Sequence, residues 1–311
     1  MVPETRLKKT IILTGPTASG KSSLALGIAE SRGDIELINA DSIQVYKKFD
    51  IGSAKPSQEE LSRVPHHLID ILEPTVRFTA GDFVKLVKEK ITEIRARNKI
   101  PLIVGGTGFY LKALLYGMWD APPTQPEIRT KLEKEETEAL YEKLKSADPD
   151  LLDKVSKNDR YRIIRALEII ESSGTLPSQL EKKTNQEADP AFTLLIIDRE
   201  QSELVKRIDK RTTEMLEAGL VNEVKSLLQD YPDAPALKSV GYQQVVDYLG
   251  GILPSGRKVS SGEKGLSDEI SLATRQLVKR QRTWFRGQTE GSWFILDSDR
   301  SKIEAELKII E

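Results

Sequence analysis

A glycine-rich segment near the N-terminus limits the possible folds of this chain more than any other feature. Residues 15–22 read GPTASGKS and match the phosphate-loop pattern G-x-x-x-x-G-K-[ST] at every fixed position. The segment follows an apolar, β-branched run at 9–14 and precedes a stretch with helical periodicity at 22–31. A strand, a glycine turn and a helix in this order predict an α/β fold of the P-loop NTPase type, with a mostly parallel sheet and helices on both faces.

The residue types of this loop suit a phosphate group. Glycines let backbone amides approach phosphate oxygens, and the helix N-terminus adds partial positive charge. Lys21 adds a full charge, and the Ser22 hydroxyl is available to Mg²⁺. The predicted phosphate-binding residues are Gly15, Pro16, Thr17, Ala18, Ser19, Gly20, Lys21 and Ser22, with Ser22 also the predicted metal ligand.

The rest of the chain alternates strands and helices on either side of an interruption. Further strands are expected at 36–40, 100–104 and 192–197, and helices at 83–97 and from 203–229 onward, with a Gly/Ser-rich loop at 250–265. From Trp119 to Pro190 the chain is first Pro-rich and then highly charged. We therefore expect a P-loop core of residues 1–118 and 191–311 and a helical insertion domain of residues 119–190.

Composition excludes several classes of protein. The 311 residues include no cysteine, so disulfides, thiolate zinc sites and a cysteine nucleophile are excluded. The two histidines cannot form a His-rich metal site by themselves. No stretch reaches the roughly 20 apolar residues that cross a bilayer, and the N-terminus lacks the pattern of a signal peptide. We expect a cytoplasmic protein without a membrane partner. The net charge is −1, yet Arg275–Arg286 holds five cationic residues and no acidic one, which suggests a local nucleic-acid contact.

The loop alone does not identify the phosphate compound. ATP and GTP are the usual ligands, but an ATPase normally has an apolar strand that ends in a metal-binding acid. Asp70 and Asp198 are weak candidates for that acid, because the run before Asp70 is short and Asp198 lies beyond the insertion. A small-molecule kinase stays possible at this point.

Two further polar segments are expected beside the loop. Ligands of parallel sheets bind beyond the carboxyl ends of the strands, where Asp41, Ser42 and Thr107 should meet the phosphate loop. A carboxylate there can act as a general base, and the Thr107 hydroxyl can donate to a leaving oxygen. Each residue alone would be explained as a turn or cap, but their joint position favours a functional role.

Several motifs together resemble the bacterial tRNA dimethylallyltransferases, the IPP transferase family. They are GPTASGKS at 15–22, INADSIQVYKKFDIGSAKP at 38–56, PHHLIDI at 65–71, VGGTGFYLKALL at 104–115, SVGYQQ at 239–244 and TRQLVKRQRTWFR at 274–286. The resemblance covers nearly the whole chain in the family's motif order and is far more specific than the loop.

The resemblance implies transfer of a dimethylallyl group from dimethylallyl diphosphate to N6 of adenosine 37, just 3′ of the anticodon in tRNA, with release of diphosphate. It implies that the loop binds the diphosphate of the prenyl donor with Mg²⁺. Asp41 matches the general base and Thr107 the residue near the bridging oxygen. Arg211 matches an arginine on the diphosphate, with Arg207 as a rival. The implied tRNA contacts are Asp41, Ser42, Ile43, Gln44, Thr107, Arg129, Tyr161, Arg162, Arg165, Lys238, Gly241, Tyr242, Gln243, Lys279, Arg280, Gln281, Arg282, Trp284 and Arg286. We expect a monomer.

The sequence alone leaves three alternative functions to weigh. An ATP-dependent nucleotide or metabolite kinase leaves the basic stripe at 275–286 without a purpose. A non-catalytic RNA-binding protein does not explain the intact Lys21-Ser22 pair. A prenyltransferase acting on free adenylate does not need a basic insertion.

Overall fold

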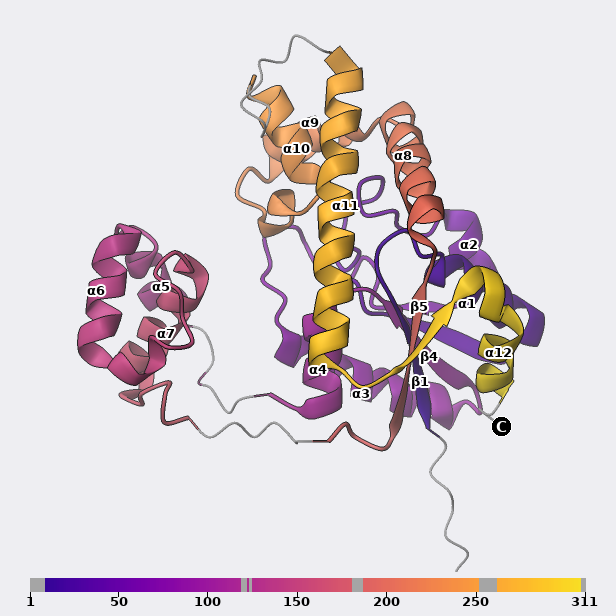
Figure 1. The fold of residues 1–311 in the computed structure, drawn as a ribbon, viewed down its shortest axis with the longest axis horizontal. Coiled ribbons are helices and arrows are strands. Elements are labelled where there is room, and N and C mark those ends of the chain that lie inside the picture. The colour runs from indigo at the N-terminus through magenta and orange to yellow at the C-terminus, as the bar shows by residue number, and fades with distance from the viewer. Residues whose placement is uncertain (1–8, 119–121, 123–124, 181–186, 252–261, 309–311) are drawn as a thin grey trace, which may run out of the picture. The chain divides into compact units, whose positions relative to one another are not determined.

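The computed structural model describes residues 9–118, 122, 125–180, 187–251 and 262–308. The chain divides into two compact units, one of residues 1–115 with 187–311 and one of residues 116–186. The first is an α/β unit built on a single sheet, and the second is a group of helices that we call the insertion unit (Figure 1). Each is described by itself.

The sheet is parallel throughout and has the order β3-β2-β4-β1-β5-β6. Its strands are β1 (Thr10–Thr14), β2 (Ile35–Asn39), β3 (His66–His67), β4 (Ile100–Gly105), β5 (Phe192–Asp198) and β6 (Ser292–Ile295). Because β1 lies between β4 and β5, the loop that follows it emerges at the middle of the sheet edge. The predicted P-loop-type α/β fold is confirmed.

The apolar runs form strands because both faces of the sheet are covered. Ile11 and Leu13 pack in one core cluster with Leu24 and Ala29 of the first helix. Ile12 points to the opposite face and is also fully buried. Continuous apolar strands of this kind are typical of parallel sheets with helices on both sides.

The helices of the α/β unit are α1 (Lys21–Arg32), α2 (Gln58–Arg63), α3 (Ala80–Ala96), α4 (Gly108–Tyr116), α8 (Gln201–Glu217), α9 (Leu220–Asp230), α10 (Tyr242–Leu249), α11 (Gly262–Gln288) and α12 (Leu296–Lys308), with a 3₁₀ turn at Pro235–Lys238. The helical stretch expected from 203–229 is two helices, because Gly219 adopts a left-handed φ of 100°. None of the helices within the described ranges is long and apolar enough to cross a membrane.

The C-terminal third is not helical throughout, and that expectation was wrong. Ser292–Ile295 forms the edge strand β6, which pairs in parallel with β5. Most of the loop expected at 250–265 lies at 252–261, outside the described residues, and α11 has already begun at Gly262.

Helices α9, α10 and α11 pack against the chain segment that follows β2. Val45 and Phe49 of that segment share a core cluster with Leu220, Tyr242 and Ile270. Phe49 and Tyr242 lie with ring centroids 4.9 Å apart. The segment that begins at Asp41 is therefore held in place by helices distant in sequence.

The insertion unit has a core of its own. Its helices are α5 (Pro126–Leu132), α6 (Thr137–Ala147) and α7 (Arg160–Ser173), with a 3₁₀ turn at Pro149–Leu151. Leu132, Leu140, Leu144, Ile163 and Leu167 are buried together. The helices form because their apolar residues recur at helical spacing and face this shared core.

Candidate active site

The phosphate loop depends on glycine at two positions. Gly15 has a φ of 150°, and a Cβ there would lie 2.0 Å from the carbonyl oxygen of Ile197. Gly20 adopts a left-handed φ of 92° immediately before α1. A side chain at either position would clash or strain the turn. The turn brings the first amides of α1 beside the loop, where they favour an anion.

Three arginines from the β5–α8 region each hold one residue of the loop. The bonds run from Arg199 Nε to Ser19 O (2.8 Å), from Arg207 Nε to Ala18 O (3.0 Å) and from Arg211 Nη1 to Thr17 Oγ1 (3.2 Å). The sequence singled out Arg211, with Arg207 as its rival, and both contact the loop. Arg199 was missed, although its position directly after the end of β5 could have marked it.

Positive charge is crowded around this loop. Burial lowers the pKa of Lys21 to about 8; the nearby Asp41 carboxylate opposes this shift and Arg211 adds to it. Burial also lowers the pKa of Arg211, again opposed by Asp41 and enhanced by Arg207. Lys21 Nζ bonds within the loop to the Pro16 carbonyl at 3.3 Å. A bound anion would relieve this crowding.

Asp41 is fixed by its own backbone. Its Oδ1 accepts hydrogen bonds from the Ile43 amide (2.8 Å) and the Gln44 amide (3.4 Å). Asn39 Oδ1 accepts from the Asp41 amide at 3.1 Å. Asp41 therefore does cap the turn that follows it, and this role uses one of its two carboxylate oxygens. Among the described residues Oδ2 has no hydrogen-bond partner, so this oxygen can face a substrate.

Thr107 is joined directly to the Asp41 segment. Its Oγ1 accepts a hydrogen bond from the Ser42 amide at 3.0 Å, and its own amide donates to Ala40 O at 3.2 Å. A Cβ at Gly105 would lie 2.3 Å from the Ala40 carbonyl oxygen, so the two segments approach as closely as glycine allows. The Thr107 hydroxyl keeps its hydrogen for donation to another acceptor.

Both candidates for the metal-binding acid of an ATPase are engaged in ion pairs. Arg282 binds Asp198 with Nη2 2.8 Å from Oδ1, and Asp198 is almost fully buried. Lys55 forms an ion pair with Asp70. Both carboxylate oxygens of Asp198 accept hydrogen bonds from Arg282, so this residue is not available as a metal ligand in this arrangement. The Arg282 side chain supports the end of β5 through these bonds, and its contact with RNA stays a prediction.

Helix α11 presents two different faces. Lys279, Arg280 and Arg286 are exposed, in agreement with a surface for a polyanion. On the inner face, the Trp284 ring lies so close to Gly108 that a Cβ there would be 2.4 Å from it. The inner face also carries Gln281, whose amide bonds to the site itself.

Lys238 and the SVGYQQ motif that follows it range from an exposed side chain to core residues. Lys238 is exposed, and Gln243 is half-buried with its Nε2 bonded to Asp247 Oδ1 at 2.8 Å. Gly241 is buried. Tyr242 is 1% exposed and its hydroxyl bonds to Glu223 at 2.7 Å. The Tyr242 ring therefore packs in the core, and the contact between this segment and RNA stays a prediction.

The arginines of the insertion unit are largely paired within the unit. Arg129 is buried, with Nε 2.9 Å from Glu133 Oε1 and its guanidinium over the Tyr161 ring. Arg165 bonds to the fully buried Glu168 at 2.9 Å. The Arg129 side chain therefore supports the core of this unit, and its contact with RNA stays a prediction.

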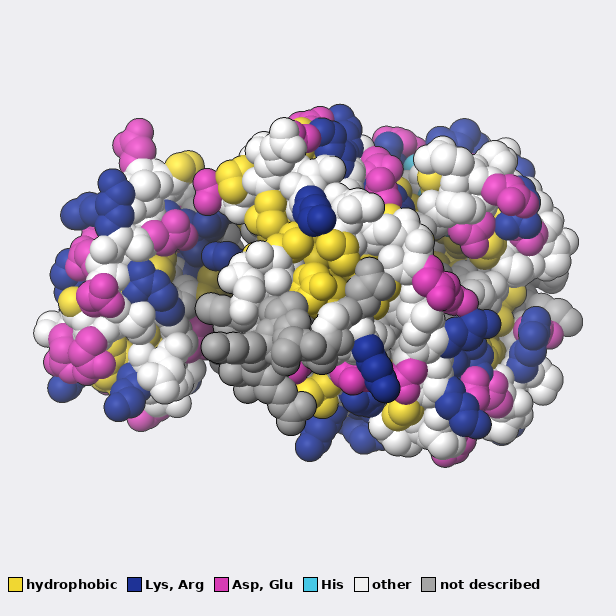
Figure 2. All heavy atoms as spheres, turned by 90° about the horizontal axis from the view of Figure 1, so that it is seen from above, with side chains coloured by type: hydrophobic (Ala, Val, Ile, Leu, Met, Phe, Trp, Pro, Cys, Tyr) yellow, Lys and Arg dark blue, Asp and Glu magenta, His cyan; other side chains and the backbone are white. Residues whose placement is uncertain are grey.

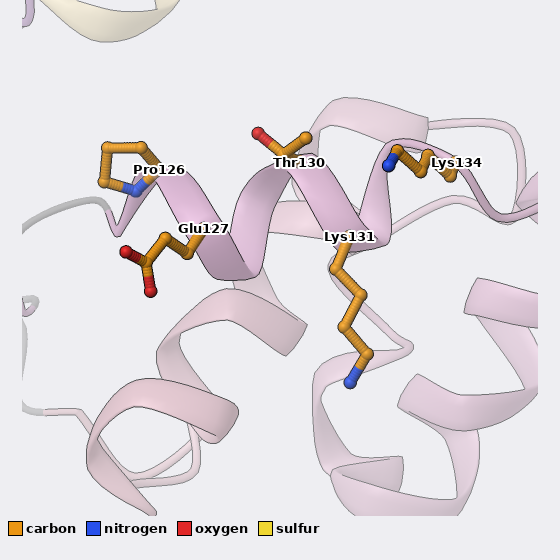
Figure 3. Close-up of a pocket in the computed structure, with 5 residues that line it drawn as sticks. All are labelled: Pro126, Glu127, Thr130, Lys131 and Lys134. Atoms are coloured by element: carbon orange, nitrogen blue, oxygen red, sulfur yellow. The ribbon is translucent and has the colours of Figure 1, made fainter.

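Two candidates of this unit stay on its surface. Tyr161 is 66% exposed, and the exposed Arg162 forms an ion pair with Asp159. On the face of this unit seen in Figure 2, Lys and Arg side chains lie among Asp and Glu side chains. A hollow along α5, lined by Pro126, Glu127, Thr130, Lys131 and Lys134, contains none of the predicted site residues (Figure 3).

The residues at the loop fit Mg²⁺ only together with a phosphate ligand. The described part of the chain has no group of three or more His, Asp or Glu side chains placed to hold a metal ion. Mg²⁺ commonly keeps several waters and takes its other ligands from a few protein oxygens and substrate phosphates. The exposed Ser22 at the start of α1 can supply one such oxygen.

Comparison with known proteins gives one consistent result. Residues 44–288 match the family model described as IPP transferase. A tRNA dimethylallyltransferase of Citrifermentans bemidjiense is 42% identical over 292 residues, covering 92% of this chain and 91% of the relative.

Solved structures agree. A tRNA isopentenylpyrophosphate transferase from Staphylococcus epidermidis has a TM-score of 0.66 at 32% identity, with 97% of this chain and 99% of that chain covered. A eukaryotic dimethylallyltransferase acting on tRNA has a TM-score of 0.76 at 25% identity, with 97% and 78% covered. The resemblance inferred from the motifs is confirmed, and this chain belongs to the IPP transferase family.

Proposed function

We propose that this protein transfers a dimethylallyl group from dimethylallyl diphosphate to N6 of adenosine 37 in tRNA. One observation carries the proposal. The hydrogen bond from the Ser42 amide to Thr107 Oγ1 joins the segment that carries the Asp41 carboxylate to the Thr107 hydroxyl, and the Asp41 charge acts on both Lys21 of the phosphate loop and Arg211 of α8. A base, a donor and an anion site therefore meet at one sheet edge. The family relationship supports the same chemistry.

In the proposed reaction, the diphosphate of the donor binds along residues 15–22 and beside Arg211. The N6 atom forms a bond to the allylic carbon while the bond from that carbon to the bridging oxygen breaks. Asp41 takes the proton lost from N6, because an adenine amine is a poor nucleophile. The Thr107 hydroxyl donates a hydrogen bond to the departing oxygen and keeps its proton. Diphosphate leaves with the electron pair of the broken bond.

Cations around the loop stabilise the charge that develops on the diphosphate. Lys21 and Arg211 already lie at the loop before a donor binds, and charges held in place in advance favour electrostatic catalysis. Mg²⁺, held by Ser22 and the diphosphate oxygens, would neutralise further charge on the leaving group. Water must be excluded, since an allylic centre with cationic character is otherwise hydrolysed.

The RNA surface of the proposal consists of exposed cations and one aromatic ring. On the α/β unit these are Lys238, Lys279, Arg280 and Arg286, and on the insertion unit Tyr161 and Arg162. Phosphates pair with the cations, and unstacked bases stack on aromatic rings. Binding should weaken as salt rises, because each phosphate contact releases counterions. The target base has to leave its stack, which costs a few kcal/mol.

The direct test uses purified protein, dimethylallyl diphosphate, Mg²⁺ and an unmodified anticodon stem-loop with adenosine at position 37. Mass spectrometry of nucleosides should find N6-dimethylallyladenosine, and inorganic diphosphate should appear in equal amount. A stem-loop with guanosine at that position is the matched control and should stay unmodified. Transfer of phosphate from ATP to a metabolite, with the RNA unchanged, would contradict the proposal.

A further inference from the structure

Gln281 of α11 connects the two loops that form the proposed donor site. Its Oε1 accepts a hydrogen bond from the Thr17 amide of the phosphate loop at 2.9 Å. Its Nε2 donates to the Gly106 carbonyl, directly before Thr107, at 3.1 Å. Both ends of one side-chain amide are used, so its orientation is fixed.

The position of Gln281 on the helix agrees with an inward role. Val278 and Phe285, three residues before and four after it, are 2% and 0% exposed. These spacings place the three residues on one helical face. The neighbouring Lys279 and Arg280 are exposed. Gln281 thus belongs to the face that packs on the site, whereas Lys279 and Arg280 point outward.

The surroundings of Gly106 locate Gln281 within the donor site. A Cβ built on Gly106 would lie 3.2 Å from Gln281 Nε2, 3.2 Å from the Gly15 carbonyl oxygen and 3.4 Å from Lys21 Nζ. The Gln281 amide, the first residue of the phosphate loop and the loop lysine therefore converge on one point. A neutral amide satisfies a donor and an acceptor there without adding charge beside Lys21.

We infer that Gln281 is a positioning residue of the donor site, which sets the spacing between the phosphate loop and Thr107, rather than a contact to RNA. This inference rests on the proposed function. The diphosphate is bound by one loop and its bridging oxygen is met by a hydroxyl on the other. Small displacements of reacting groups cost large factors in rate, about 10²-fold for 1 Å. Loss of the link should slow transfer while the RNA still binds.

The test compares Gln281→Met in the full chain with two other variants of α11. Methionine has a similar length and shape but can form neither bond. We expect kcat for prenyl transfer to fall about 10- to 100-fold, while Kd for the unmodified stem-loop stays within about 2-fold. Gln276→Met changes an exposed glutamine of the same helix and should behave as wild type. Arg280→Ala should show the opposite pattern, a weaker Kd for RNA and little change in kcat.

Two outcomes would overturn the inference. One is a Gln281→Met enzyme with kcat within about 3-fold of wild type. The other is a rise in Kd for RNA like that of Arg280→Ala with kcat unchanged, which would make Gln281 an RNA contact. If Gln281→Met does not fold, Gln281→Asn is judged by the same criteria, since its amide is one methylene too short to reach both loops.

Binding of inorganic diphosphate without RNA separates this inference from the proposed function. If wild type transfers prenyl groups and Gln281→Met matches it, the inference alone fails. If wild type transfers none, yet Gln281→Met binds diphosphate about 10-fold more weakly, the proposed function fails and the role of Gln281 in the anion site stands.

Discussion

The phosphate-loop site and the insertion unit both place a carboxylate among arginines, but the charges are balanced only in the insertion unit. In the insertion unit the carboxylate of Glu168 is fully buried. It accepts from Arg165 at 2.9 Å and from the Gln125 amide at 2.9 Å, and Arg129 lies 3.5 Å away. These bonds satisfy both oxygens, and the cluster holds α5 and α7 together.

At the phosphate loop the balance is different. Burial lowers the pKa of both Lys21 and Arg211, and a neighbouring arginine lowers each further, with Asp41 acting against the shift. Asp41 uses Oδ1 for its own turn, and Oδ2 has no partner within the described residues. The positive charges at the phosphate loop are thus not fully balanced, which suits a binding site for an anion. The charges around Glu168 are balanced, which suits a structural role.

The largest effect we expect comes from the Asp41–Thr107 pair. If Asp41 were a structural counterion like Glu168, its loss would affect folding more than turnover. We predict instead that Asp41→Ala and Thr107→Ala each reduce transfer by about 10²-fold or more, through loss of the base and of the donor to the leaving oxygen. RNA binding should persist.

Single-turnover kinetics with saturating donor measure this effect. Asp41→Asn is the matched variant, because it keeps an oxygen that can accept from the Ile43 amide but cannot take a proton from N6. Near-normal turnover of Asp41→Asn and Thr107→Ala would contradict a catalytic role for these residues. A large fall in the melting temperature of both variants would indicate that Asp41 and Thr107 are structural, as Glu168 is.

The second prediction concerns Glu168 of the insertion unit. Glu168→Gln removes the counter-charge of Arg165 and leaves Arg129 paired with Glu133 alone. Breaking a buried pair costs about 3 kcal/mol. Hydrogen exchange of the α7 amides should rise accordingly, while binding of inorganic diphosphate to the α/β unit stays unchanged. Glu171→Gln is the control, because its carboxylate lies 3.8 Å from the exposed Lys131 and should contribute less than about 1 kcal/mol. Equal effects of the two substitutions would contradict a structural role specific to Glu168.

The local parts of this site were predictable from sequence. The phosphate loop follows from glycines at fixed spacing between an apolar strand and a helix, and the sheet edge follows from the ends of β2 and β4. Asp41 and Thr107 could be placed together because parallel strands end at the same side of a sheet. These inferences need only residue type and short-range periodicity.

The missed parts depend on contacts between distant segments. Strand β6 has only four residues, Ser292–Ile295, and forms because β5 offers a free edge. Arg282 looked like an RNA contact within a basic stripe, but its partner Asp198 is on another element. Gln281 has a weak local signal, its position three residues after Val278 and four before Phe285. Only the packing of α11 on α8 shows where that face points.

The third prediction uses the titration of Lys21, whose pKa in the free protein is lowered to about 8. Below pH 8 Lys21 is charged and should bind diphosphate fully. Above pH 8 it loses its proton, so affinity should fall by up to about 10-fold for each pH unit. Calorimetry from pH 6.5 to 9.5 without metal measures this. Lys21→Arg keeps its charge and records the titration of the ligand alone. Parallel curves for both proteins would show that Lys21 does not control the site.

The smallest expected effects compare single surface arginines of the two units. Arg280 of α11 is exposed and forms no ion pair within the described ranges, whereas Arg162 of α7 is paired with Asp159. An unpaired cation contributes its full charge to a phosphate, while a paired one has first to give up its partner. We predict a roughly 5- to 10-fold rise in Kd for the stem-loop with Arg280→Ala, and a salt slope reduced by about 1. Arg162→Ala should change Kd about 2-fold. Filter binding between 50 and 200 mM salt measures Kd for both variants. A larger loss of affinity with Arg162→Ala than with Arg280→Ala would mean that RNA displaces Asp159 from Arg162. Pairing in the free protein would then not identify a structural cluster.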